Sequence, residues 1–338
     1  MLQHRIALAA AALAGLLLET GFASAAESQC KKIAGLQLEA CKSEVHEDFL
    51  TSKAKCLNLA DKADRDPCLA DAKDEASETG ALCKEQRAAR RDLCEALGED
   101  RYAPGFDPAD FETDFANPAH PNAYFPLEIG QQWHYSGPGE EISIEVLDKT
   151  KSIEGVTCVV SRDVVETAGQ PVEDTDDWFG LRSDGTVFYC GEISQSFELF
   201  AGDDPQEAEL VDIEGSWKAG RNGALAGSVF LGAPTVGAVY RQELARGDAE
   251  DAAEILSTTY AFGSSTELDP FVPASLANLL CGNADCIVTR EFTPIHPDDF
   301  ERKYYARGVG LFLEVNPQSG EAVRLTDCNV APVCENLP

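Results

Sequence analysis

The sequence predicts an α+β protein, in which an N-terminal, disulfide-stapled antiparallel helical hairpin is followed by a mainly antiparallel β domain. Six cysteines are spaced symmetrically within residues 26–98, and helix-forming residues dominate the segments between them. After Pro126 the chain changes to short alternating runs broken by glycine, which is typical of antiparallel strands. With 338 residues, the chain is also long enough for two folded units.

Residues 1–25 have the pattern of a secretory signal peptide. Arg5 ends a short basic segment, an apolar run follows from Ile6 to Leu18, and Ala23-Ser24-Ala25 matches the small-x-small site of signal peptidase. An apolar run of this length spans about 20 Å of helix, whereas the hydrocarbon core of a bilayer is about 30 Å thick. We therefore expect cleavage before Ala26, no membrane anchor, and a periplasmic or secreted mature protein.

The twelve cysteines all follow the predicted cleavage site, which indicates disulfides formed in an oxidising compartment. The first six are Cys30, Cys41, Cys56, Cys68, Cys83 and Cys94, and their successive spacings are 11, 15, 12, 15 and 11. Only the pairs Cys30–Cys94, Cys41–Cys83 and Cys56–Cys68 have residue numbers with one common sum, 124. Disulfides between two antiparallel helices require such a common sum, because equal gaps along both helices place each cysteine at the height of its partner. The sequence thus predicts three nested disulfides in residues 26–98.

Turn and cap residues complete the predicted hairpin. The turn is expected near residue 62, with Asp66 as the N-cap of the second helix, Pro67 at its first position, and Gly98 as its end. The other six cysteines follow no such rule, and they are Cys158, Cys190, Cys281, Cys286, Cys328 and Cys334. Short loops favour the pair Cys328–Cys334 first and Cys281–Cys286 second, and the remaining pairing stays open.

Residues 99–121 combine prolines with Asp and Glu, which predicts an acidic linker outside the core. Three phenylalanines, Phe106, Phe111 and Phe115, lie within it. The β domain is then expected over residues 122–338. Because strands do not alternate with helices there, a parallel nucleotide-binding sheet is disfavoured.

The segment Tyr304–Leu311 reads Tyr-Tyr-Ala-Arg-Gly-Val-Gly-Leu. It resembles the YYAxGVGL segment of a group of uncharacterised bacterial secreted proteins, and residues 174–179 and 215–217 are similar to other segments of that group. The resemblance implies a β hairpin near the C-terminus, whose glycines allow a close backbone approach. It implies no particular activity.

The net charge and the absence of known motifs disfavour several classes of function. The chain has 59 acidic and 27 basic residues, a net charge of −32, and most of the excess lies after residue 98. Binding of nucleic acid or of an anionic membrane surface is therefore disfavoured. The sequence contains no hydrolase nucleophile elbow, phosphate-binding loop, zinc-protease motif or EF-hand pattern. No catalytic residue or organic cofactor is assigned.

The sharpest site candidate is a calcium site formed by Asp174, Asp176 and Asp177, since calcium prefers several oxygen ligands. The alternative for this acidic run is a solvated turn or strand edge. Asp248, Glu250 and Asp251 form a weaker cluster, expected on a helix or loop surface. The three tryptophans could line a ligand cleft, although core packing is the stronger expectation, and they are Trp133, Trp178 and Trp217.

Two functions remain. The first is an exported, non-catalytic protein whose β domain binds a ligand or a protein partner and carries the hairpin as a rigid arm. The second is an extracytoplasmic enzyme of unrecognised type that uses carboxylates of the β domain. A filled core with an exposed apolar groove would favour the first, and a deep pocket with two close carboxylates in unequal environments would favour the second.

Overall fold

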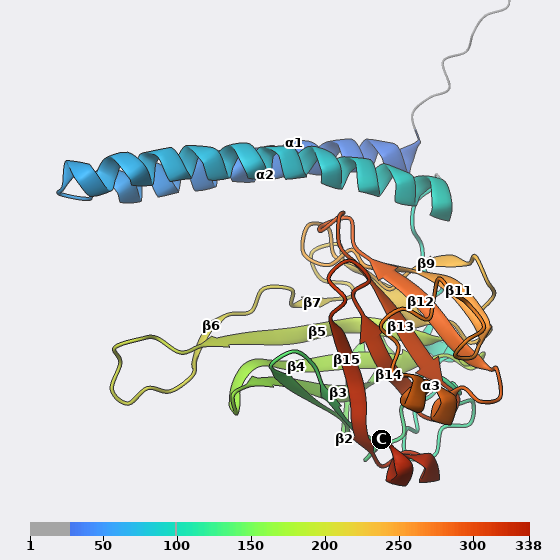
Figure 1. The fold of residues 1–338 in the computed structure, drawn as a ribbon. Helices are drawn as coiled ribbons and strands as arrows, with labels where there is room; N and C mark the ends of the chain where they lie inside the picture. Colours follow the sequence, from blue (N-terminus) through green and yellow to red (C-terminus); the bar gives the residue numbers. More distant parts are fainter. Residues whose placement is uncertain (1–27, 99) are drawn as a thin grey trace, which may run out of the picture.

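The computed structural model describes residues 28–98 and 100–338 (Figure 1). The predicted signal peptide and its cleavage site lie outside these residues. Among the described helices, none is long and apolar enough to cross a membrane.

The N-terminal unit is the predicted helical hairpin, made of α1 (Gln29–Leu57) and α2 (Lys62–Leu97). The three nested disulfides are confirmed, with Cα–Cα distances of 5.8, 5.8 and 5.6 Å for Cys30–Cys94, Cys41–Cys83 and Cys56–Cys68. Only Ala34, Leu38 and Cys56 of α1 are buried, so the disulfides take the place of an apolar core.

The start of α2 differs from the sequence expectation. The helix begins at Lys62, and its N-cap is Asp61, whose side chain accepts a hydrogen bond from the Ala63 amide at 2.9 Å. Asp66 and Pro67 therefore lie inside the helix rather than at its start. A capping aspartate was available one turn earlier, and it sets the helix boundary.

The β domain is antiparallel, as predicted, and forms one large sheet. Its strands are β1 (Gln132–Ser136), β2 (Glu140–Ile153), β3 (Val156–Thr167), β4 (Gln170–Leu181), β5 (Val187–Glu198), β6 (Glu209–Asp212), β7 (Trp217–Lys218), β8 (Leu225–Phe230), β9 (Val239–Arg241), β10 (Glu243–Leu244), β11 (Ala252–Tyr260), β12 (Cys286–Phe292), β13 (Phe300–Ala306), β14 (Gly310–Val315) and β15 (Ala322–Cys328). Three short helices are added, η1 (Pro108–Asp110), α3 (Ala274–Leu280) and η2 (Pro332–Asn336).

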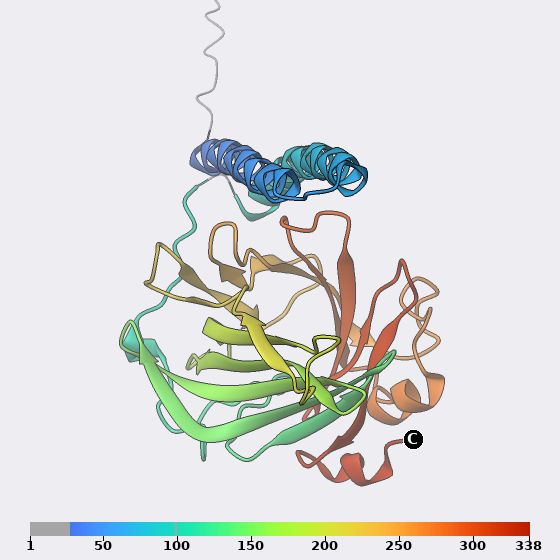
Figure 2. The same ribbon diagram turned by 90° about the vertical axis from the view of Figure 1, so that its left-hand side faces the viewer.

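The sheet curls until its two edges nearly meet. Its strand order is β10-β8-β5-β4-β3-β2-β1-β15-β14-β13-β12-β11-β9. The edge strands β9 and β10 follow each other along the chain, with only Gln242 between them, so residues 239–244 pair with β11 at one end and with β8 at the other. Figure 2 shows this curled sheet with the hairpin lying over it. The inner face of the sheet consequently surrounds an interior space.

The remaining disulfides lie in the β domain, and every cysteine is paired. Cys281–Cys286 and Cys328–Cys334 form as predicted. The third, Cys158–Cys190, links β3 to β5, the two neighbours of β4. The resemblance at Tyr304–Leu311 implied a β hairpin, and this segment does contain the turn between β13 and β14.

A linker outside the core was expected over residues 99–121, but the structure of residues 100–121 differs from this expectation. Phe111 and Phe115 are only 8% and 2% exposed, and both belong to the apolar clusters of the β domain. The rings of Phe106 and Phe111 lie 5.1 Å apart, and both contact Phe188 of β5. The aromatic side chains in this acidic segment therefore anchor it to the sheet, because burying them outweighs the polar character of their neighbours.

The hairpin is anchored to the β domain by buried polar contacts. Arg90 of α2 forms an ion pair with Glu250 at 2.9 Å, and these side chains are 5% and 0% exposed. Gln86 donates a hydrogen bond to the Ile295 carbonyl at 2.9 Å. Glu250 is thus a buried partner of the hairpin. The expectation that it belongs to a cluster on a helix or loop surface was wrong.

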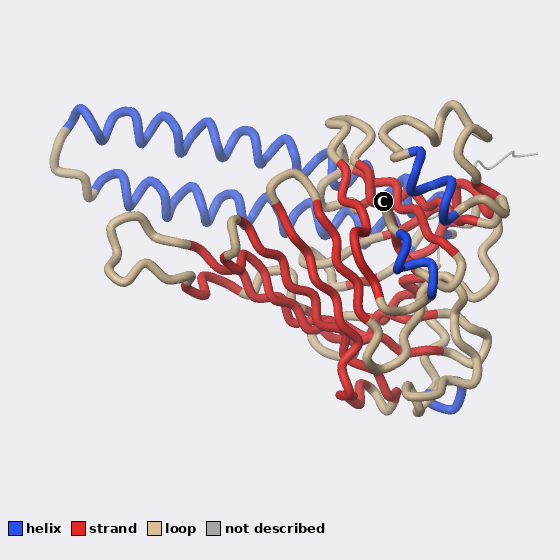
Figure 3. Tube along the Cα trace, turned by 60° about the horizontal axis from the view of Figure 1, so that its bottom comes forward, coloured by secondary structure: helices blue, strands red, loops and turns tan. Residues whose placement is uncertain are grey.

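One hairpin of the β domain projects from its body. This β5–β6 arm, residues 193–213, extends in the same direction as the helices (Figures 1 and 3). It exposes several apolar side chains, among them Leu199, Phe200, Leu210 and Ile213.

Candidate functional site

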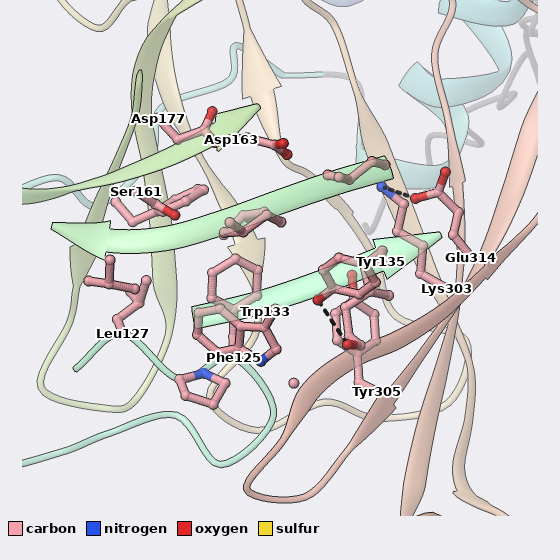
Figure 4. A pocket seen from close by; sticks show the side chains of 18 of the residues that line it. Phe125, Leu127, Trp133, Tyr135, Ser161, Asp163, Asp177, Lys303, Tyr305 and Glu314 are labelled. Atoms are coloured by element: carbon pink, nitrogen blue, oxygen red, sulfur yellow. Dashed lines mark hydrogen bonds and ion pairs between the residues drawn. The ribbon is translucent and has the colours of Figure 1, made fainter. Parts of the chain in front are cut away.

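A cavity of about 300 Å³ lies on the inner face of the curled sheet. Six aromatic side chains line it, and they are Phe125, Trp133, Tyr135, Phe179, Tyr189 and Tyr305. Six polar side chains also line it, and they are Ser161, Asp163, Asp177, Glu291, Lys303 and Glu314. In Figure 4, Phe125 and Trp133 lie at one end of the cavity, Asp163 and Asp177 lie at the other, and Lys303 and Glu314 lie to one side next to Tyr135. The cavity therefore has an apolar end and a charged end.

Hydrogen bonds fix the aromatic walls. The Trp133 indole N–H donates to the Val309 carbonyl at 2.7 Å, and the Tyr135 hydroxyl donates to the Leu311 carbonyl at 3.0 Å. Both acceptors lie in or beside the turn between β13 and β14, the segment that the sequence resemblance singled out. Because these polar atoms are already bonded, the ring faces present apolar surface to the cavity.

Among the described residues, Lys303 is the only basic side chain that lines this cavity. Its ammonium nitrogen lies 3.2 Å from a carboxylate oxygen of Glu291 on β12 and 3.2 Å from one of Glu314 on β14. Burial opposes a charge on Lys303, but Glu291 and Glu314 outweigh burial and raise its pKa well above the usual value. Glu291 also accepts a hydrogen bond from the Tyr305 hydroxyl at 3.0 Å. Lys303 is thus held between two carboxylates.

Asp163 and Asp177 form an acid pair on adjacent strands. In the β3–β4 register, Asp163 lies opposite Thr175 and Asp177 lies opposite Ser161, so the two aspartates are diagonal neighbours on one face. Burial, followed by the charges of Glu173 and Glu314, raises the pKa of Asp163 from 3.8 to about 7. The labelled side chains lie beside each other in Figure 4.

The two aspartates have unequal surroundings. Burial and the charge of Glu192 raise the pKa of Asp177 well above its usual value, although a hydrogen bond donated by the Tyr189 hydroxyl works in the opposite direction. In contrast, Oδ1 of Asp163 is buried and has no hydrogen-bond partner among the described residues. A buried carboxyl oxygen without a donor is costly, so this atom is a natural contact for a hydrogen-bond donor of a ligand.

Further acids lie near Asp177 without lining the cavity. Burial raises the pKa of Glu192 to about 7, and burial also raises the pKa values of Glu243 and Asp251. These side chains come from β5, β10 and the loop before β11. Protonation is the way in which so many neighbouring carboxyl groups remain in a space with little water.

The predicted calcium ligands are not brought together. Successive residues of β4 point to opposite faces of the sheet, and Asp177 lines the cavity. Asp174 and Asp176 instead pair with Arg162 at 2.6 Å and with Lys149 at 2.8 Å. Within the described residues, no group of three or more His, Cys, Asp or Glu side chains is arranged to hold a metal ion. Calcium binding by this run stays a prediction.

The tryptophans are divided between two places. Trp133 lines the cavity, whereas Trp178 and Trp217 belong to a second apolar cluster. Asp163 and Lys303 were missed from the sequence, because each follows an arginine within a strand segment, and neighbouring charges there usually indicate a solvated outer face. Their only signal is alternation: Glu301, Lys303 and Tyr305 occupy every second position of β13.

No family model, curated protein or solved structure matches this chain. The function is therefore inferred from the geometry of the cavity.

Proposed function

We propose that this chain is an exported binding protein, whose β domain holds a small, partly apolar organic cation in its interior cavity. The observation that carries the proposal is the acid pair of Asp163 and Asp177 at one end of an otherwise aromatic cavity, with one buried carboxyl oxygen left without a donor. An ammonium group would supply that donor and a compensating charge.

The size and lining of the cavity support a compound of one or two rings. A cavity of about 150 Å³ is known to hold benzene, and binding sites for small molecules begin near 300 Å³. The cavity in this protein has about 300 Å³, and aromatic rings form its apolar end. Aromatic faces also attract cations, because the ring face carries the negative part of the quadrupole.

The charges of the cavity favour a cation over an anion. Four carboxyl groups line it, from Asp163, Asp177, Glu291 and Glu314, against the one ammonium group of Lys303. A bound cation would stabilise the ionised form of Asp163, whose pKa without ligand is about 7. Binding should therefore release a proton, and the affinity should increase as the pH rises through about 7.

The test is a calorimetric titration of the mature protein with tryptamine, its neutral alcohol analogue tryptophol, and indole-3-propionate. We expect saturable binding of tryptamine, at least tenfold weaker binding of the other two, and a tryptamine affinity that increases from pH 6 to pH 8. Asp163→Asn should weaken tryptamine binding at least tenfold, whereas Asp148→Asn, at an exposed position of β2, should not. Equal binding of all three probes would refute a cation site.

The compartment is part of the proposal. Six disulfides indicate an oxidising, extracytoplasmic environment. We propose that residues 1–25 direct export and are removed before Ala26, giving a periplasmic or secreted protein. N-terminal sequencing of the protein from its native source tests this step, and retention of Met1 in a membrane fraction would contradict it.

An enzyme is the second candidate, because the acid pair provides two neighbouring carboxyl groups in unequal environments, the arrangement that acid–base catalysis uses. Native mass spectrometry of protein purified from its own source can identify the natural ligand. The ligand is then incubated with the protein for hours and analysed for chemical change. Conversion that Asp177→Asn abolishes would establish an enzyme, and recovery of the intact ligand would leave a binding protein.

A further inference from the structure

A second hollow, which we call the outer pocket, lies on the face of β4 and β5 opposite to the cavity. It has a volume of about 280 Å³, and it lies at the base of the β5–β6 arm. Four basic side chains line it, and they are Lys151, Lys218, Arg221 and Arg246. This concentration is notable in a chain whose net charge is −32.

A glycine allows β7 to lie close to β5 beside the outer pocket. Gly191 of β5 lies opposite Trp178 of β4 on one side and opposite Lys218 of β7 on the other. A Cβ at Gly191 would lie 2.4 Å from the Trp217 carbonyl oxygen and 2.6 Å from the Lys218 Cα, so only glycine allows β7 to approach this closely. Gly191 therefore lets β7 pack directly against β5, which places Lys218 in the lining of the outer pocket.

The basic groups are poorly neutralised by the protein itself. The Lys151 ammonium lies 3.2 Å from the centre of the Trp178 ring, and burial and then the nearby charge of Lys218 lower the pKa of Lys151. Within the described part of the chain, neither Lys218 nor Arg221 forms an ion pair. Only Arg246 has such a partner, since it lies 3.6 Å from Glu250. Like charges held together without a counter-charge attract an anion.

Two carboxyl groups also line the outer pocket, from Glu192 and Asp248. Asp248 is exposed, so solvent screens its charge. Burial raises the pKa of Glu192 to about 7, so a large share of this group is protonated near neutral pH. Neither therefore cancels the four basic side chains.

We infer that the outer pocket binds a small organic polyanion, such as a tricarboxylate or a phosphate ester. Arginine and lysine are the residues that bind carboxylate and phosphate oxygens, arginine with two parallel hydrogen bonds and lysine as a point charge. The volume exceeds what a single inorganic ion needs and suits an organic molecule with several charges. The repulsion from the acidic surface is screened within about 8 Å at physiological salt, whereas the basic side chains are in direct contact with the ligand.

The experiment titrates the full mature protein with citrate and with glycerol 3-phosphate at constant ionic strength, using calorimetry. At least one of the two should bind with a stoichiometry of one per chain. Lys218→Ala and Arg221→Ala should each weaken that binding at least tenfold, and Lys218→Arg should retain most of it. Lys149→Ala is the matched control, because Lys149 is exposed, lies on β2 near Lys151 and does not line the pocket.

The two probes separate the sources of the anion: binding of citrate alone identifies a carboxylate site, and binding of glycerol 3-phosphate alone identifies a phosphate site. Near-UV circular dichroism of each variant establishes that its fold is intact. The inference is overturned if neither probe binds, or if Lys149→Ala weakens binding as much as Lys218→Ala does.

Discussion

Individual ionisable side chains on the inner face of the sheet determine what the cavity can bind. Asp163 and Asp177 are kept in a space with little water, where their protonated forms are favoured, whereas Lys303 keeps its charge because two glutamates contact it. One sheet face thus holds two aspartates with raised pKa values beside a charged ion-pair network. A ligand that enters would change the protonation of the two aspartates more readily than that of Lys303 and its glutamates.

The raised pKa of Asp163 predicts a pH-dependent contribution to stability. Its pKa is about 7 in the folded protein against an ordinary value of 3.8, so the folded state holds this proton more tightly. The resulting stabilisation is fully present below about pH 3.8 and is lost as the pH rises through about 7. The side chain of Asp163→Asn cannot titrate. The free energy of unfolding of the wild type should therefore decrease relative to that of the variant as the pH rises from 5 to 8.

Urea unfolding at several pH values measures this difference. Asp148→Asn, at an exposed site, should show no comparable trend. A difference between wild type and Asp163→Asn that stays constant across this pH range would contradict the raised pKa.

At the scale of elements, the hairpin could be predicted in detail because disulfide geometry links sequence spacing directly to distance. The strands were largely predictable from alternation. The curling of the sheet was not, because alternation in residues 236–244 indicates a strand but does not show that β9 pairs with β11 while β10 pairs with β8. The burial of Phe111 and Phe115 was missed since acidic neighbours and prolines dominate the local composition. The cavity was missed because its lining comes from strands far apart in the sequence, among them β1, β3, β4 and β12 to β14, so strand pairing rather than any motif assembles it.

The nested disulfides should contribute unequally to the hairpin. Cys30–Cys94 closes a loop of 64 residues, which alone corresponds to about 4 kcal/mol of chain entropy. While Cys41–Cys83 remains, however, the segments that the outer bridge closes are much shorter, so its removal should cost only about 3 kcal/mol. The variant Cys30→Ser/Cys94→Ser should therefore lose protection against hydrogen exchange at the helix ends near these residues. Amides of the β domain serve as the internal control. A uniform loss of protection throughout the chain would contradict the prediction that the outer disulfide stabilises only the helix ends.

At the scale of the whole molecule, the hairpin and the β domain form a single unit in which charge has an unusual distribution. The interior cavity is rich in acids, the outer pocket is rich in basic groups, and the curled sheet separates them by one layer. Glu250, which binds Arg90 of the hairpin, is preceded by the loop that supplies Arg246 and Asp248 to the outer pocket. The contact between the units therefore also fixes one wall of the outer pocket.

The Arg90–Glu250 pair should control the attachment of the hairpin. Burial works against ionisation of Glu250, but hydrogen bonds from Arg90 and the Gly247 amide hold its pKa below the usual value. Arg90→Ala would leave the buried carboxylate with only Arg246, 3.6 Å away, as a cation, and breaking a buried pair typically costs about 3–5 kcal/mol. Replacing both partners, in Arg90→Met/Glu250→Met, removes both buried charges, so the double variant should be clearly more stable than Arg90→Ala.

The measurements are urea unfolding and hydrogen exchange of α2 and of residues 245–251. A lowered pKa also predicts that the contribution of the pair is present above about pH 4.5, the ordinary value for a glutamate, and is lost as the pH falls below it. Arg90→Ala should accordingly approach the wild type in stability under acidic conditions, while exchange near Glu250 increases at neutral pH. If Arg90→Ala and the double variant were equally destabilised at neutral pH, the loss would come from packing of the side chains, and the ion pair would not be what holds the hairpin to the sheet.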